Sequence, residues 1–436
     1  MKIQRIQLKN YRCFTDLEIE LHDKLTVFVG NNGSGKTSIL EGLAISLGSV
    51  FTKLDGLKGG SINKNDVRLK AYPMGESIDI QPQYPVEIST HGIINGLPVK
   101  WKRALNSEKG GTTIKDAKQI LDVAENYQAR LRAGDQSLIL PFIAYYGTGR
   151  LWDYHREKKS DVFRTHSRTN GYIDSLSGTA NIKLMMNWFN KMSYEKLKNN
   201  MLDKPSSVEL DMVYDAMKQC FSRITGYTNV ELLYNIFTNE IDCNFVDEQN
   251  LQKSIPLSRM SDGYKGTLSL IADIAYRIAI LNPQLGTNGL QETSGIVLID
   301  EVDLHLHPAW QHRILSDLCD IFPKIQFVVT THAPAVISSV RSENLVILKN
   351  DEVIDPFSEI YGNDANSILK EIMGVAERNP TIAAKFEQFN RLLNDGLLDE
   401  AETVLDEIDR QREYHDKEVA ADRVKLKLER IRRRGK

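Results

Sequence analysis

The residues best suited to chemistry form one short run near the N-terminus, GNNGSGKT from Gly30 to Thr37. Glycines at this spacing let backbone N–H groups turn towards phosphate oxygens, and Lys36 can reach the outer phosphates of a nucleotide. Thr37 can ligate Mg²⁺ through its hydroxyl group. The run therefore predicts a site for ATP and Mg²⁺, made by Asn31, Asn32, Gly33, Ser34, Gly35, Lys36, Thr37 and Ser38.

A second group of candidate residues lies far downstream, at the ends of two apolar runs. Residues 294–299 read as a buried parallel strand that ends at Asp300 and Glu301. Asp300 at such a strand end can hold Mg²⁺, and the neighbouring carboxylate of Glu301 can polarise the water that attacks a phosphate. Residues 325–330 read as another buried strand, after which His332 could contact the γ-phosphate and sense its presence.

These residues can act together only if strands and helices bring them to one place. Apolar residues 25–29 before the glycine-rich run indicate a buried strand, and residues 38–45 after it indicate a helix. The N-terminus of that helix would face the phosphates with its positive dipole end. Ser261 and Gly263 stand at the start of a second helical pattern that reaches residue 281, and they suit another phosphate-binding helix N-terminus.

Each of these assignments has a structural alternative. The chain could bind nucleotide without hydrolysing it, although the four residues needed for hydrolysis, Lys36, Thr37, Asp300 and Glu301, are all present. His332 could be a core histidine at a strand end, and Ser261 could simply cap its helix. Capping and phosphate binding are compatible, so both roles of Ser261 stay open. His305 and His307 alternate along the chain and point to opposite sides, which disfavours a shared metal ion.

Taken together, these motifs resemble the ABC-type ATPases of the RecF, SMC and Rad50 group. Residues 3–14 look like the first strands of that group, and Arg12 within them is a further candidate for nucleotide binding. Residues 260–263 stand where the group has its Leu-Ser-x-Gly signature, which caps the nucleotide bound by a partner subunit. Residues 300–308 are similar to the compact branch that includes the OLD ATPases.

Two finer matches, residues 143–150 and 361–369, together with a charged helical tail, resemble PtuA, the ATPase subunit of Septu anti-phage systems and of some retrons. The resemblance implies a head-to-tail homodimer or a higher even-numbered oligomer around two ATP–Mg²⁺. It also implies an HNH nuclease partner (PtuB-like), held through the C-terminal region, and contact with DNA through the complex. No nuclease constellation is visible in this sequence, so cleavage would belong to that partner.

One position departs from the ABC pattern. Tyr145, Tyr146 and Gly147 stand at the strand end where these ATPases usually have a glutamine that helps to ligate Mg²⁺ and the water. The resemblance therefore leaves two alternatives open, a looser metal site or a charge supplied by Arg150. Without this glutamine, hydrolysis is expected to be slow.

Composition excludes several other classes of protein. Four cysteines without CxxC spacing argue against a zinc site or disulfide framework and fit a reducing cytoplasm. No apolar run approaches the length of a membrane span, so no membrane contact is expected. The net charge of −3 means that any DNA contact must come from a local patch. Basic residues between Arg150 and Lys204, including Arg168, read as a solvated face or such a patch.

The pattern along the chain predicts an α/β fold. We expect a P-loop ABC-type ATPase with an N-terminal antiparallel β subdomain, a central helical insertion and a helical C-terminal tail. The expected segments are a first ATPase lobe (1–150), a mainly helical insertion (151–254), a second lobe (255–355) and a partner-binding tail (356–436). In the tail, residues 383–394 and 397–412 read as two short helices.

The last residues of the tail carry eight basic side chains against one acid from Arg423 to Lys436. Their apolar residues do not make a clean helical stripe, so this end is expected to become ordered only on binding nucleic acid or an acidic protein groove. Two other functions also fit the sequence. A DNA-repair ATPase of the RecF or SMC kind would bind DNA without a nuclease partner, and a scaffold would use nucleotide only for stability.

Overall fold

The computed structural model describes residues 1–151, 167–178, 181–203, 208–354, 359–374, 380–410 and 417–434. Their contacts divide the chain into two compact units, Met1–Asn363 and Asp364–Lys436, each with a core of its own. The finer divisions expected at residues 150, 254 and 355 stay predictions. Among the described residues, no helix combines the length and the apolar character needed to cross a bilayer.

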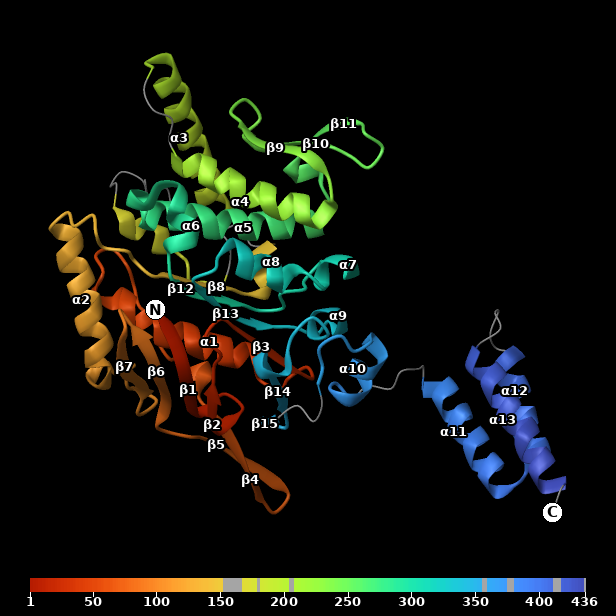
Figure 1. The fold of residues 1–436 in the computed structure, drawn as a ribbon. Coiled ribbons are helices and arrows are strands. Elements are labelled where there is room, and N and C mark those ends of the chain that lie inside the picture. Colours follow the sequence, from red (N-terminus) through yellow and green to blue (C-terminus); the bar gives the residue numbers. More distant parts are fainter. Residues whose placement is uncertain are drawn as a thin grey trace. The chain divides into compact units, whose positions relative to one another are not determined.

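A six-stranded sheet forms the centre of the first unit (Figure 1). Its order is β15-β14-β3-β13-β12-β8, with five parallel strands and the short antiparallel β15 at one edge. The strands β8, β12 and β13 are buried along their whole length, as their mostly apolar sequences favour. The bounds are β3 (Leu25–Gly30), β8 (Phe142–Tyr146), β12 (Gly295–Ile299), β13 (Ile325–Thr330), β14 (Leu345–Lys349) and β15 (Glu352–Ile354).

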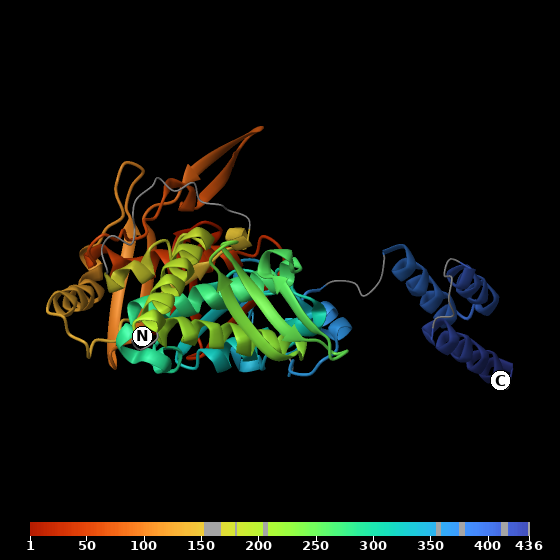
Figure 2. The same ribbon diagram turned by 90° about the horizontal axis from the view of Figure 1, so that it is seen from above.

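A four-stranded antiparallel sheet covers one side of this centre, with helix α1 (Lys36–Leu47) between the two sheets (Figure 1). Its order is β2-β1-β6-β7, and the strands alternate buried and exposed side chains. The bounds are β1 (Lys2–Tyr11), β2 (Phe14–Glu20), β6 (Val86–Ile94) and β7 (Leu97–Leu105), and α2 (Lys118–Arg132) packs against β7. A hairpin of β4 (Leu69–Met74) and β5 (Ser77–Pro82) projects from this side (Figure 2).

Helices cover the other face of the central sheet. Helix α5 (Asp262–Leu281) contacts β8, and α4 (Val208–Thr225) packs along α5 with α3 (Ile182–Met201) beside them. The expectation of a mainly helical segment misses a three-stranded sheet, β9 (Thr228–Asn235), β10 (Glu240–Val246) and β11 (Gln252–Pro256). Short helices complete the unit: α6 (Gly289–Glu292), α7 (Pro308–Gln311), α8 (Ile314–Ile321) and α9 (Pro334–Ile337).

The second unit contains the helices α10 (Ala365–Glu371), α11 (Pro380–Asp395), α12 (Leu398–Arg410) and α13 (Lys417–Arg434). The two short helices expected from the sequence are confirmed as α11 and α12, which are joined at Gly396 in the left-handed conformation (φ 82°). The expectation for the basic end is wrong. It forms α13, whose Val419 and Leu426 are buried with side chains of α11 and α12.

Candidate functional site

The glycine-rich run forms a tight loop between β3 and α1. Gly35 has φ 88°, and a Cβ atom there would lie 2.3 Å from Cζ of Phe14. Only glycine can therefore occupy this position, where the loop turns into the helix and packs against the start of β2. The backbone N–H groups of the first turn of α1 have no partner within the helix and can face an anion.

Lys36 lies buried along this loop. Its Nζ donates hydrogen bonds to the carbonyl oxygens of Gly30 (2.8 Å) and Asn31 (2.9 Å). Burial lowers the pKa of Lys36, and the nearby carboxylates of Asp300 and Glu301 oppose this shift. An ammonium group held only by neutral carbonyls would gain from a phosphate, whose charge interacts with it more strongly.

Asp300 lies at the end of β12 and is held from two sides. Thr37 Oγ1 donates to Asp300 Oδ2 at 2.8 Å, and Thr330 Oγ1, from the end of β13, donates to Oδ1 at 2.6 Å. Glu301 follows in the left-handed conformation (φ 47°), and its backbone N–H donates to Thr330 Oγ1 at 2.7 Å. Thr330 therefore fixes both carboxylate residues, a role that the sequence did not reveal.

His332 follows β13 and is half-buried beside the two carboxylates. Burial lowers the pKa of His332, and the positive charge of Lys36 lowers it further. The carboxylates of Glu301, Asp303 and Asp300 raise the pKa, but the lowering effects are larger. The imidazole is therefore neutral at pH 7 and can donate or accept a hydrogen bond. Thr331 Oγ1 anchors the segment by donating to Asp303 Oδ1 at 2.5 Å.

These side chains surround one open cavity of about 460 Å³. It is lined by Arg12, Cys13, Asn32, Gly33, Gly35, Lys36, Thr37, Ser38, Asp300, Glu301 and His332. Of these, only Cys13 was not a candidate from the sequence. Burial raises the pKa of the Cys13 thiol to about 11, with a further contribution from Asp351, so it is a neutral wall residue and not a nucleophile.

Two further candidates, Asn31 and Ser34, belong to the loop behind this lining. Ser34 Oγ is buried and has no hydrogen-bond partner among the described residues, which is unusual for a hydroxyl group and fits a loop shaped for phosphate oxygens. Arg12 reaches the cavity while its Nε donates to Asp66 Oδ1 at 2.9 Å and its guanidinium pairs with Glu41. Its charge is therefore shared with two carboxylates of its own chain.

The donor set fits ATP and Mg²⁺. The hydroxyl of Thr37 and one carboxylate oxygen of Asp300 lie 2.8 Å apart, and both are oxygen ligands of the kind that Mg²⁺ takes. The buried lysine and the glycine-rich loop fit the phosphates on the same side of the cavity.

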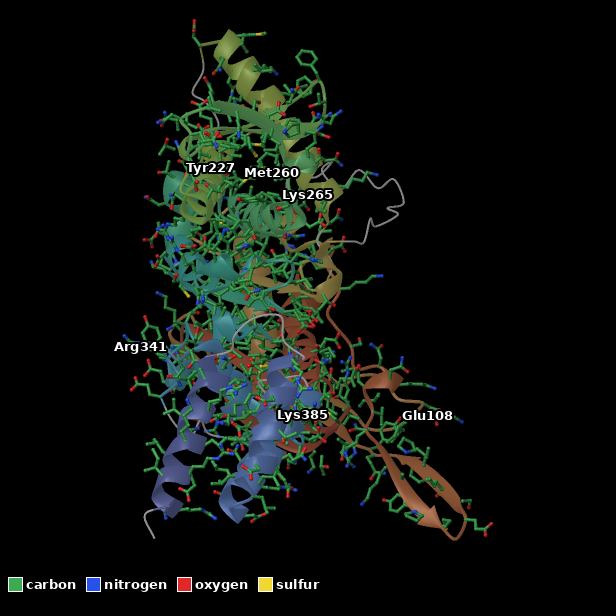
Figure 3. All side chains as sticks on the ribbon, turned by 90° about the vertical axis from the view of Figure 1, so that its right-hand side faces the viewer. Glu108, Tyr227, Met260, Lys265, Arg341 and Lys385 are labelled. Atoms are coloured by element: carbon green, nitrogen blue, oxygen red, sulfur yellow. The ribbon has the colours of Figure 1, made fainter. Side chains whose placement is uncertain are left out.

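Ser261 and Gly263 lie outside this cavity, at the N-terminus of α5. Ser261 is exposed, and within the part of the chain that the structure describes its side chain makes no capping hydrogen bond. A Cβ atom on Gly263 would lie 2.6 Å from the carbonyl oxygen of His305, so close packing requires glycine. Figure 3 labels Met260 and Lys265, which flank this segment.

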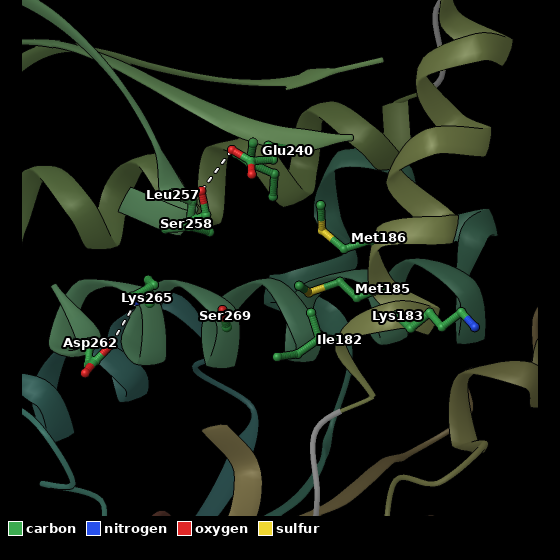
Figure 4. Close-up of a pocket in the computed structure, with 11 residues that line it drawn as sticks. Ile182, Lys183, Met185, Met186, Glu240, Leu257, Ser258, Asp262, Lys265 and Ser269 are labelled. Carbon is green, nitrogen blue, oxygen red and sulfur yellow. Dashed lines mark hydrogen bonds and ion pairs between the residues drawn. The ribbon is translucent and has the colours of Figure 1, made fainter. Parts of the chain in front are cut away.

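A larger cavity of about 590 Å³ lies beside the same helix end (Figure 4). Apolar side chains of α3, among them Met185 and Met186, form one wall, and Asp262 and Lys265 of α5 form another. Lys265 pairs with Asp262 at 2.9 Å within this wall. Residues 260–263 therefore lie beside a partly apolar cavity. This cavity is separate from the one lined by Lys36 and Asp300.

The end of β8, where the expected glutamine is missing, is hydrogen-bonded to α5. The phenol of Tyr146 donates to Asp273 Oδ2 at 2.7 Å, and Arg277 Nε donates to the same oxygen at 2.7 Å. All three side chains are buried. The carbonyl of Tyr146 also accepts the backbone N–H of Asp300 at 2.8 Å, so one residue joins the candidate Mg²⁺ ligand to the helix that starts at Ser261.

Replacing Tyr146 with phenylalanine is expected to lower the free energy of unfolding by about 1.5–3 kcal/mol, because a buried hydrogen bond to a charged acceptor is lost. The matched control is Tyr172→Phe, whose buried hydroxyl donates to a neutral acceptor, the carbonyl oxygen of Pro141. That change should cost only about 1 kcal/mol. Equal losses for the two variants in denaturant titrations would contradict a charged network around Asp273.

In the basic stretch between Arg150 and Lys204, the structure describes Arg168 and the lysines of α3. Arg168 is half-buried, and its guanidinium donates to the carbonyl oxygens of Leu281 (2.6 Å) and Leu138 (2.6 Å). It therefore stabilises the fold and does not belong to a solvated patch. The side chain of Arg150 and residues Arg156, Lys158, Lys159 and Arg164 lie outside the described residues.

Comparison with known proteins agrees with this geometry. A family model described as "AAA domain" matches residues 5–225, just over half of the chain. The chain is 28% identical to "Retron Ec83 probable ATPase" of Escherichia coli, over 87% of this chain and 77% of that protein. It is 26% identical to "Retron Vc95 probable ATPase" of Vibrio cholerae serotype O1 biovar El Tor, over 91% of this chain and 84% of that protein.

A third relative, "Septu protein PtuA" of Bacillus thuringiensis, is 23% identical over 90% of this chain and 89% of its own length. These similarities extend over most of the chain and confirm the resemblance drawn from the motifs. The chain therefore belongs to the AAA domain family, and within it is a PtuA- and retron-like ATPase.

Proposed function

We propose that this chain binds and hydrolyses ATP as a subunit of an anti-phage defence complex, and that its nucleotide state gates a partner HNH nuclease that cleaves DNA. The observation that carries the ATPase part is the convergence of Lys36, Thr37, Asp300 and Glu301 on one cavity from the ends of two parallel strands, β3 and β12. The similarity to ATPases named for retrons and for Septu supports the defence part.

Five side chains that line the cavity have roles in this proposal. Lys36 and the loop amides bind the phosphates, and Thr37 and Asp300 hold Mg²⁺, which neutralises phosphate charge when bound. Glu301 orients the attacking water, and Thr330 keeps its backbone in place. His332, neutral and half-buried, donates to or accepts from the γ-phosphate region and so distinguishes ATP from ADP.

The second part of the ATP site comes from another copy of the chain. Ser261 and Gly263 lie at a helix N-terminus outside the cavity of their own chain, since neither residue lines it. In a head-to-tail dimer this N-terminus would cover the phosphates bound by the partner copy. The assembly is accordingly a homodimer or a higher even-numbered oligomer.

The nuclease partner is expected to bind the C-terminal region, and DNA is contacted through the complex. In this proposal the chain itself hydrolyses ATP but does not cut DNA. Among the described residues, no group of three His, Cys, Asp or Glu side chains is placed to hold a metal ion. The cleavage reaction is assigned to the partner on the strength of the PtuA resemblance alone.

Co-purification with the product of an adjacent HNH gene tests the proposal. DNA cleavage by the purified complex should depend on ATP concentration, and a complex that carries Lys36→Ala should lose that dependence while it still assembles. If no nuclease co-purifies and DNA alone stimulates ATP hydrolysis, a repair-type ATPase replaces this proposal.

A further inference from the structure

Thr330, at the end of β13, contacts three successive residues that follow β12, and it is fully buried. Its Oγ1 donates to Asp300 Oδ1 at 2.6 Å and accepts the backbone N–H of Glu301 at 2.7 Å. Its carbonyl oxygen accepts the backbone N–H of Val302 at 2.9 Å. One residue of the neighbouring strand therefore holds the whole turn that carries the two carboxylates.

The two hydrogen bonds of the Thr330 hydroxyl have a fixed direction. A hydroxyl group has one hydrogen atom, and a backbone N–H such as that of Glu301 can only donate. The hydrogen of Thr330 must therefore point to Asp300, while its oxygen faces Glu301. The hydroxyl thus ties the carboxylate of one residue to the backbone of the next.

This contact decides how the carboxylate of Asp300 is turned. The last torsion of an aspartate side chain is broad, so the side chain does not fix the plane of its own carboxylate. Thr330 holds Oδ1, and Oδ2 then lies 2.8 Å from Thr37 Oγ1. These are the two oxygens that fit Mg²⁺. A carboxylate that could turn would present this pair of oxygens for only part of the time.

The same contact stabilises the backbone at Glu301. Its φ of 47° is unfavourable for a residue with a Cβ atom and persists only where surrounding contacts hold it. The hydrogen bonds from the N–H groups of Glu301 and Val302 to Thr330 are such contacts. The direction in which the Glu301 side chain leaves the backbone therefore depends on Thr330.

The next residue, Thr331, is equally buried but makes different contacts. Its Oγ1 donates to Asp303 Oδ1 at 2.5 Å and accepts the backbone N–H of Ala333 at 3.0 Å. Neither of these contacts involves the candidate Mg²⁺ ligand. Burial at this strand end is therefore not enough to hold the carboxylates, and the position of the Thr330 hydroxyl is what matters.

We propose that Thr330 is a positioning residue for ATP hydrolysis, and that its hydroxyl sets both the affinity of the site for Mg²⁺ and the direction of Glu301. This inference rests on the proposed function and adds to it the residue through which metal binding and water activation depend on each other. Groups that orient a metal ligand from behind typically contribute about 10- to 100-fold to metal affinity or activity.

The test is Thr330→Val in the full chain, which keeps the branched shape of the side chain and removes the hydroxyl. The Mg²⁺ concentration that gives half-maximal ATP hydrolysis is expected to rise by about 10- to 100-fold, and kcat at saturating Mg²⁺ should also fall. Binding of ATP without Mg²⁺ should not change, because Lys36 and the loop amides are untouched. Thermal unfolding with ATP at increasing Mg²⁺ concentrations measures metal binding without turnover.

Two controls separate this role from a general loss of stability. Thr330→Ser keeps the hydroxyl and should retain most of the Mg²⁺ affinity and of kcat. Thr90→Val removes another fully buried hydroxyl, which lies 2.6 Å from Ser46 Oγ and does not line the cavity. It should lower the stability in denaturant titrations and leave the Mg²⁺ dependence of hydrolysis unchanged.

Each contrary result is distinct. An unchanged Mg²⁺ dependence in Thr330→Val, or an equal change in Thr90→Val, overturns the role of Thr330 while the proposed function stands. A wild-type chain that neither binds nor hydrolyses ATP overturns both. If Thr330→Val does not fold, Thr330→Ser still decides, because a folded serine variant with a raised Mg²⁺ requirement contradicts a role carried by the hydroxyl.

Discussion

Replacing Glu301 with glutamine is expected to slow ATP hydrolysis by about 10²- to 10⁴-fold, because a neutral amide cannot act as the general base. ATP binding should change little, since Lys36 and the loop amides remain. The backbone N–H of residue 301 still donates to Thr330 Oγ1, so the turn after β12 is preserved. Single-turnover phosphate release and equilibrium binding of ATP, measured on the same protein, separate the two effects.

The control for this variant is Glu343→Gln, at an exposed glutamate after α9 that does not line the cavity. It should hydrolyse ATP at the wild-type rate. If Glu301→Gln hydrolyses ATP as fast as the control, the catalytic water is activated elsewhere, and the role given to Glu301 is wrong.

Replacing Lys36 with alanine is expected to weaken ATP binding by at least about 30-fold, because a buried cation beside the triphosphate is lost. The free chain should keep its fold. Lys36 is buried against neutral carbonyls, and the burial that lowers its pKa also costs free energy in the folded state, so its removal relieves part of that cost.

Thermal unfolding with and without ATP–Mg²⁺ checks this prediction. In the wild type, ATP at about 100 times its dissociation constant should add about 2.7 kcal/mol to the stability of the folded state. In Lys36→Ala the same concentration should add little. Lys36→Arg is an informative control, because it keeps the charge but not the compact ammonium group that fits the loop. An ATP-induced shift in Lys36→Ala as large as in the wild type would contradict the phosphate site.

Much of the site could be predicted from the sequence because its residues occur in short local patterns. The glycine-rich run, the Asp300–Glu301 pair and His332 each follow an apolar strand whose neighbours in the sheet can be inferred from the α/β pattern. The carboxyl ends of parallel strands lie at the same edge of the sheet. The cavity at this edge is lined by the residues that the sequence predicted, such as Lys36, Asp300 and His332.

Contacts between distant segments could not be predicted in this way. Thr330 looked like the last residue of a strand, and only the pairing of β12 with β13 places its hydroxyl against Asp300. Tyr146 and Asp273 are separated by 127 positions in the chain, and nothing local marks them as partners. The sequence showed that a glutamine was missing, but it did not show the buried link to α5 that occupies the strand end.

Two errors in the fold have a physical explanation. The strands β9 and β10 alternate buried and exposed residues, such as Val230, Leu232 and Tyr234, and this period of two was overlooked next to two long helices. The apolar residues of α13 serve two faces, so no single stripe was visible. Val419 and Leu426 face the core of the second unit, whereas Val424, Leu428 and Ile431 are exposed.

The central claim is that ATP is bound between two copies, with the loop of one facing Ser261 of the other. Mixing two inactive variants, Lys36→Ala and Ser261→Arg, tests it most directly. A mixed dimer would have one site with both defects and one intact site, so equal mixing should restore about one quarter of the wild-type ATP hydrolysis. If Ser261→Arg alone hydrolyses ATP at the wild-type rate, or if mixing restores nothing, the shared site is contradicted.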